Sequence, residues 1–177
     1  LGIKFFINDL SSISLRDFIP VFHEWIRKQI VDDHLLIDVH DYSHVQHGPG
    51  ILLVAHEGNF SIDMGAGRPG LFYWRKQRAS KGNENLLEDV VKPALQACHL
   101  LEEEPRLGKR PLFRTDELLV VANDRLDAPN NEETLARLQP VLSDTFKRLL
   151  GGADSKITRV NVDPKERFQV HVQTGQS

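Results

Sequence analysis

The sequence predicts an α+β fold: a two-layer sandwich in which a mixed, mainly antiparallel sheet carries its helices on one face. Two observations favour this class. A segment at 20–30, PVFHEWIRKQI, returns in altered form at 140–150 as PVLSDTFKRLL. Two strand-like runs follow each copy, and short connections join them as hairpins, so neighbouring strands are expected to run antiparallel.

The repeat extends to the segments before these helices. An apolar run ending in Asn-Asp precedes each copy, FFIND at 5–9 and VVAND at 120–124. Repetition of this kind is typical of internal duplication. We therefore expect two pseudo-repeated β-α-β-β units, residues 3–57 and 118–173, that superpose and are joined by a strand and a helix in 71–101.

The first half begins with a predicted strand at 3–8. A helix then runs from about Ser14 to Gln29, because Ser14 is a suitable N-cap and Asp17 stands three positions later. Its apolar residues recur at helical spacing, at Phe18, Phe22, Trp25, Ile26 and Ile30. Two runs rich in branched residues, LLIDVHD and ILLVAHE, then predict a hairpin of strands 35–41 and 51–57.

The remaining elements follow from the same signals. Asn85 and Asn130 are suitable N-caps for two more helices, and Gly151-Gly152 ends the second of them. Asp163 and Pro164 predict the turn of a last hairpin. The predicted elements are strand 71–77, helix 85–101, strand 117–123, helix 131–150 and strands 156–162 and 167–173.

Composition places the chain among ordinary globular proteins. It is 40% hydrophobic and 27% charged over 177 residues, which fits a single domain, 1–177. The net charge of −3 gives no general attraction to nucleic acid or anionic lipid. The single cysteine, Cys98, excludes an intrachain disulfide, and no apolar run approaches the roughly 20 residues of a membrane span. We expect a cytoplasmic protein with no membrane or nucleic-acid partner.

Histidines gather in the first predicted hairpin. Asp38, His40 and His56 share one strand parity, and two imidazoles with a carboxylate can bind a transition metal. The alternative is a solvated hairpin whose turn residues, His44 and His47, are merely polar. The spacing matches no strong metal signature, so it identifies neither a metal nor a catalytic residue.

A ligand surface is expected on the sheet face away from the helices. The cleaner apolar parity, Leu35, Ile37 and Val39 with Leu53 and Ala55, should face the helices. The other parity mixes polar with apolar residues, as a half-covered surface does. Arg75 on a neighbouring strand could add a cation for an anionic group. The predicted ligand-binding residues are Asp38, His40, His56 and Arg75.

Two further motifs carry weaker signals. Gly65, Gly67 and Gly70 match the spacing of a dinucleotide fingerprint, but a strand rather than a helix is predicted to follow them. Phe72-Tyr73-Trp74-Arg75-Lys76 mixes aromatic and basic residues, as nucleic-acid stacking surfaces do. Alternate residues of a strand point to opposite faces, so core aromatics are the simpler interpretation.

Residues 41–76 carry a resemblance. The run DYSHVQHGPGILLVAHEGNFSID, followed by GRPGLFYWRK, resembles segments of an uncharacterised bacterial protein family of unknown function. This resemblance implies a bacterial source. It identifies no activity, cofactor or catalytic residue. The duplicated β-α-β-β order is also similar in outline to ferredoxin-like and tautomerase-like proteins. The latter act through an N-terminal proline, whereas Leu1 begins this sequence, so their chemistry is not carried over.

No complete catalytic constellation emerges from the residues. We therefore predict a non-catalytic binding module for a small molecule or a protein partner, with homo-oligomers formed through free strand edges. The alternative is a metal- or histidine-assisted enzyme acting from the 35–57 hairpin face, with Glu57 as a further carboxylate.

Overall fold

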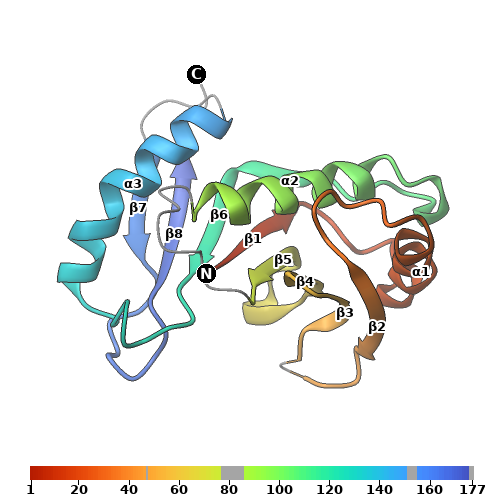
Figure 1. Ribbon diagram of the computed structural model, residues 1–177, viewed down its shortest axis with the longest axis horizontal. Coiled ribbons are helices and arrows are strands. Elements are labelled where there is room, and N and C mark those ends of the chain that lie inside the picture. Colours follow the sequence, from red (N-terminus) through yellow and green to blue (C-terminus); the bar gives the residue numbers. More distant parts are fainter. Residues whose placement is uncertain (47, 77–85, 151–154, 176–177) are drawn as a thin grey trace.

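The computed structural model describes residues 1–46, 48–76, 86–150 and 155–175. These residues form one antiparallel sheet in the order β2-β3-β4-β5-β1-β6-β8-β7 and three α-helices, which confirms the α+β class (Figure 1). The strands are β1 (Gly2–Ile7), β2 (Leu36–Tyr42), β3 (Gly50–Ala55), β4 (Gly58–Asp63), β5 (Gly70–Arg75), β6 (Phe113–Val121), β7 (Ser155–Arg159) and β8 (Gln169–Thr174). The helices are α1 (Phe18–Lys28), α2 (Glu88–Glu102) and α3 (Glu132–Leu150).

All three helices contribute to the same hydrophobic core on one side of the sheet. Alternate strand residues supply the other half of this core, among them Ile3, Phe5, Phe60, Leu118 and Val170. We call the opposite surface the open face. It carries the other parity of the strands, including Gly2, Lys4 and Phe6 of β1, Asn59 and Ser61 of β4, Phe72 and Trp74 of β5, and Glu117 of β6.

The entry into the first helix confirms the predicted cap. The Ser14 hydroxyl accepts from the Arg16 N–H, and the Asp17 carboxylate accepts from the Ser14 N–H. This capping box starts a short 3-10 turn, Leu15–Asp17, that leads directly into α1. Three other predicted features, the Asn85 cap, the Gly151-Gly152 stop and His47, lie outside the described residues.

The strand β4 was not predicted. Its sequence, GNFSID, alternates polar with apolar residues as a strand does, but Gly58, Asn59 and Asp63 are residue types that are depleted in strands. The strand is central in its half of the sheet, paired with β3 and β5. Phe60 and Ile62 enter the core while Ser61 is fully buried on the open face. Because both faces are buried, tertiary packing outweighs the weak local propensity.

The expected repeat of 3–57 on 118–173 is not confirmed by the strand order. In the second half β8 returns to pair with β6, the first strand of that half. In the first half β5 pairs with β1, and β3 lies beyond β4, so it does not occupy the place of β8. The superposition stays a prediction for the strand and helix that begin each half.

The predicted parity of β2 is wrong at its start. The register shifts between Leu36 and Asp38, so a bulge interrupts the alternation there. Leu36 is buried, whereas Leu35 and Ile37 are 57% and 53% exposed. One extra residue in an edge strand exchanges the two faces, and the sequence pattern does not reveal it.

Candidate functional site: a cleft on the open sheet face

A cleft of about 620 Å³ opens on the open face, between residues of the β2–β3 connection and of the β7–β8 hairpin. This volume lies in the range of small-molecule sites, roughly 300–1,000 Å³. Eight described residues line it: Pro49, Phe72, Trp74, Asn123, Arg125, Lys165, Glu166 and Arg167.

Two aromatic rings from β5 form its floor. Phe72 and Trp74 are two residues apart on one strand, so they point to the same face, and their ring centroids are 5.4 Å apart at 34°. Both are partly exposed. Gly2 on β1 makes room for them, because a Cβ there would lie 2.9 Å from two atoms of the Phe72 ring. The result is a partly exposed aromatic surface made of two rings that are tilted relative to each other.

The opposite wall is cationic. Arg125 and Arg167 come from the segment after β6 and from the β7–β8 hairpin. The Arg125 Nη1 donates to the Lys165 carbonyl at 2.7 Å, and the Arg167 Nη1 donates to the Asn123 Oδ1 at 3.1 Å. These solvent-exposed bonds link the two segments and give each guanidinium one protein partner.

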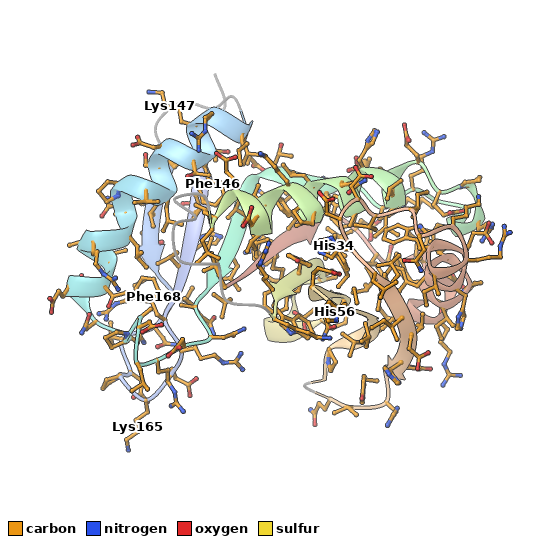
Figure 2. The ribbon with its side chains drawn as sticks, in the orientation of Figure 1. His34, His56, Phe146, Lys147, Lys165 and Phe168 are labelled. Atoms are coloured by element: carbon orange, nitrogen blue, oxygen red, sulfur yellow. The ribbon has the colours of Figure 1, made fainter. Side chains whose placement is uncertain are left out.

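Charge at this wall runs against the charge of the whole protein. The lining includes three cationic side chains and one carboxylate, Glu166, although the chain carries −3 overall. Figure 2 shows Lys165 at the tip of its hairpin. The cleft therefore offers a local positive potential beside an aromatic floor, a combination that favours flat anions.

A charged network adjoins the cleft on the same face. We call it the Glu117 network. Arg68 donates to both carboxylate oxygens of Glu117, at 2.7 and 2.8 Å, and Arg114 is 2.7 Å from Oε2. His171 Nε2 lies against Oε1 of the same carboxylate. Lys4, directly opposite Phe72 in the sheet, contacts Asp63 at 2.5 Å.

Phe6 is enclosed by this network. The Arg68 guanidinium lies 3.8 Å from the Phe6 ring centroid, the Lys4 ammonium lies 5.7 Å away, and the His171 ring meets it edge-on at 6.1 Å. Both cations are placed for cation–π contact. The network covers the open face beside the cleft.

Burial and pairing shift two ionisable groups of the network. Hydrogen bonds from Arg68 lower the pKa of Glu117 to about 2, although burial acts in the opposite direction. Burial lowers the pKa of Lys4, and the nearby Asp63 carboxylate opposes that effect. Glu117 is saturated by donors and is held ionised, so it has a structural role beside the cleft.

Two of the predicted ligand-binding residues lie on the open face. Asp38 pairs with Val54 and His40 with Leu52, and these partners have the parity opposite to the core residue Leu53. The His40 Nε2 is 3.6 Å from the Asp38 Oδ2. Neither residue lines the cleft, because β2 is the far edge strand, three positions from β5.

His56 is exposed after the end of β3, where its N–H donates to the Leu35 carbonyl. Figure 2 places it in the half of the molecule opposite Lys165. It is not among the described residues that line the cleft.

The predicted position of Arg75 on the open face is wrong. Arg75 shares the parity of Tyr73, which is in the helix-side core, and its Nη1 lies 3.5 Å from the Asp89 Oδ2 on α2. The predicted set of four residues is therefore split between two faces of the sheet. Alternation along one strand shows which of its own residues share a face. It does not show which residues of a different strand lie on that same face.

The described residues give little support to chemistry at the histidine hairpin. Among them, no three His, Cys, Asp or Glu side chains gather closely enough to hold a metal ion. His40 and Asp38 form a pair without a third ligand. The metal- or histidine-assisted enzyme stays a prediction without a supporting contact.

The glycine-rich segment is anchored rather than free to fold over the face. The Gly65 carbonyl accepts from the Lys4 Nζ at 3.3 Å, and Arg68 is held by Glu117. Strand β5 begins at Gly70, so no helix follows the glycines as a dinucleotide site requires. Cys98 is buried, and burial raises the pKa of its thiol well above the usual value, which makes it unreactive.

Sequence reasoning missed most of the cleft. The aromatic and basic run at 72–76 predicts core aromatics, whereas Phe72 and Trp74 are partly exposed and line the cleft. Their spacing of two residues indicates that both rings lie on one face of the strand, with Tyr73 on the other. Helices on one side of the sheet can bury only one of these two faces. Arg125 and Arg167 are far apart in sequence, and only the pairing of β6 with β8 brings their segments together.

Comparisons with known proteins add no relative: no protein-family model, curated protein or solved structure matches the chain. No helix in the described part of the chain is long and apolar enough to cross a lipid bilayer.

Proposed function

We propose that the protein is a non-catalytic binding module for a small anionic molecule with a flat aromatic ring, held in the open-face cleft. One observation carries this proposal: a partly exposed aromatic pair, Phe72 and Trp74, faces two arginines that backbone and amide contacts hold in place.

The aromatic pair supplies the affinity for a ring. Stacking a flat heteroaromatic ring on an aromatic side chain contributes about 1–3 kcal/mol, and any ring with a π-face can use it. Trp74 lies opposite Gly2 of β1 in the sheet. Because glycine has no side chain, β1 places nothing beside Trp74 that would compete with a ligand ring.

The arginines supply the affinity for an anion. A guanidinium has five N–H donors in a planar fork that matches carboxylate or phosphate oxygens. A hydrogen bond to a charged group contributes about 1.5–3 kcal/mol. Because Arg125 and Arg167 are already tethered, less side-chain entropy is lost when they bind an anion.

The lining favours binding over catalysis. Its described residues include no histidine, cysteine or serine, and the one carboxylate, Glu166, is exposed to solvent. General acid–base catalysis needs a group with a suitably placed proton and a tuned pKa.

Isothermal titration calorimetry with a panel of flat anions tests the proposal. The panel consists of adenosine monophosphate and indole-3-acetate, with adenosine and inorganic phosphate as the separated halves. At least one complete flat anion should bind, and each half should bind more weakly. Trp74→Leu and Arg125→Gln should each weaken binding by about 10-fold or more.

Arg110→Gln is the matched control for Arg125→Gln, because Arg110 is also exposed and lies outside the cleft lining. The proposal fails if no flat anion binds. It also fails if Arg110→Gln weakens binding as much as Arg125→Gln, or if adenosine binds as tightly as its monophosphate.

The homo-oligomer also stays a prediction, and the two sheet edges give it no support. On β2 the Asp38 carboxylate accepts from the Val39 N–H at 2.8 Å, which satisfies a backbone donor of the edge strand. On β7 Lys156 is exposed. A carboxylate that occupies a backbone donor of an edge strand, and lysines on such a strand, both hinder pairing with the edge of another sheet.

A further inference from the structure

A second pocket lies on the helix side of the sheet, between the residues just before α2 and the helix α3. Its volume is about 1080 Å³. Val120 and Ala122, at the end of β6, line its base together with Phe168. Asn123 and Arg125 line both pockets, so this one lies behind the wall of the open-face cleft. We call it the helix-side pocket.

The walls of the helix-side pocket are largely apolar. Leu138, Val141 and Leu142 of α3 line one side, and Leu86 and Leu87 line the other. Val141 is 51% exposed and Leu86 is 37% exposed, although each lies beside buried apolar neighbours. Exposed apolar side chains around a concave surface are typical of a ligand site.

The polar groups of this pocket are mainly cationic. Arg75, Lys76, Arg125 and Arg137 line it, against the carboxylates of Asp124 and Asp127. The Asp124 carboxylate accepts from two backbone N–H groups of its own turn. Four cationic side chains therefore face two carboxylates, and the Asp124 carboxylate is engaged by its own turn.

Arg75 is the strongest polar feature. Its Nε is buried and has no hydrogen-bond partner among the described residues. Its Nη1 lies 3.5 Å from both the side-chain Oδ2 and the carbonyl of Asp89, at the limit of a hydrogen bond. The Arg75 side chain lines the pocket and is 22% exposed, so a carboxylate there can accept from its Nη nitrogens.

We propose that the helix-side pocket binds a single-chain carboxylate, that is, an alkyl chain of fatty-acid type ending in one carboxylate. The alkyl chain lies over Val120 and Phe168 and against Val141 of α3. The carboxylate accepts hydrogen bonds from Arg75. This site is independent of the ligand proposed for the open-face cleft, because the two ligands contact opposite sides of the 123–125 segment.

Titration with dodecanoate below its micellar concentration tests the proposal, with dodecanol as the uncharged arm. Binding is followed by displacement of a fluorescent fatty acid from the whole chain. Dodecanoate should displace the probe at concentrations at least 10-fold lower than dodecanol does. Val141→Glu, which places a charge beside the chain, and Arg75→Gln should each weaken dodecanoate binding by about 10-fold or more.

Val160→Glu is the matched control, since Val160 is 50% exposed and lies outside the pocket lining. Circular dichroism melting confirms that each variant is folded. Val141→Glu keeps the test decisive should Arg75→Gln fail to fold, because Val141 is half exposed. Equal affinity for dodecanol and dodecanoate, no displacement by dodecanoate, or equal losses in Val141→Glu and Val160→Glu would each overturn the proposal. Binding only to lipid vesicles, with no displacement by free dodecanoate, would overturn it too.

Discussion

At the scale of single residues, buried charge on the open face is balanced by contacts rather than by water. Glu117 is 6% exposed yet ionised, because Arg68 and Arg114 supply charged donors to both oxygens. Removing one partner from such a network leaves the others buried and unpaired, which costs more than the pair contributes. The stability of the Glu117 network therefore depends on this one carboxylate.

Replacing this carboxylate should reveal its contribution. Glu117→Gln should lower the free energy of unfolding at pH 7 by about 3 kcal/mol, measured by urea denaturation. The folded pKa of Glu117, about 2, is below its unfolded value of 4.5. The stability it contributes is therefore complete above about pH 4.5 and is lost as the pH falls toward 2.

The variant should accordingly lose less stability than the wild type between pH 5 and about pH 3. Asp116→Asn is the control, because Asp116 is more exposed and pairs with Arg114 at the rim of the network. The interpretation is contradicted if Glu117→Gln is as stable as the wild type and follows the same pH profile.

Gly50 illustrates a different constraint at the same scale. Its φ is +67°, and a Cβ would lie 2.0 Å from the Ile62 carbonyl oxygen. Gly67 has a similar φ of +69° with nothing within 4 Å. Gly67→Ala should therefore cost about 1 kcal/mol, the backbone term alone. Gly50→Ala should cost about 3 kcal/mol or more, because a backbone clash is added. Equal losses in thermal or urea unfolding would show that the close contact does not matter.

At the scale of elements, the sequence predicted the helices and seven of the strands but not the faces they share. Ser14 and the stripe through Phe22 and Trp25 define α1 locally, so propensity and capping were sufficient there. Strand β4 was missed because its burial on both faces comes from β3 and β5. The bulge in β2 moved Ile37 outward, which no local signal marks.

The candidate site shows the same division more sharply. Asp38 and His40 were placed on the correct face, since alternation holds once the bulge is passed. Arg75 was misplaced because its face depends on the register of β5 against β1 and β4. The cleft itself joins residues 49 to 167, and only the complete strand order brings them to one place. Sites assembled from distant segments are beyond the reach of pattern reasoning on a single sequence.

At the scale of the whole molecule, the helices concentrate on one side and leave the open face to be covered by its own side chains (Figure 1). The Glu117 network covers one part of that face, and the cleft occupies the next. The segment that follows β6 separates this cleft from the helix-side pocket. The arrangement is that of a scaffold with two concave surfaces on opposite sides of one strand end.

The NMR signals of the two tryptophans of the chain can test the proposed binding at the cleft. Trp74 forms part of the cleft floor, whereas Trp25 is 2% exposed in the core beside Phe22. In a nitrogen–proton correlation NMR spectrum each indole N–H gives its own signal. Titration with adenosine monophosphate or indole-3-acetate should shift the Trp74 signal progressively and leave the Trp25 signal in place. Saturable binding that leaves the Trp74 signal unmoved, or that shifts Trp25 instead, would contradict the assignment of the cleft as the ligand site.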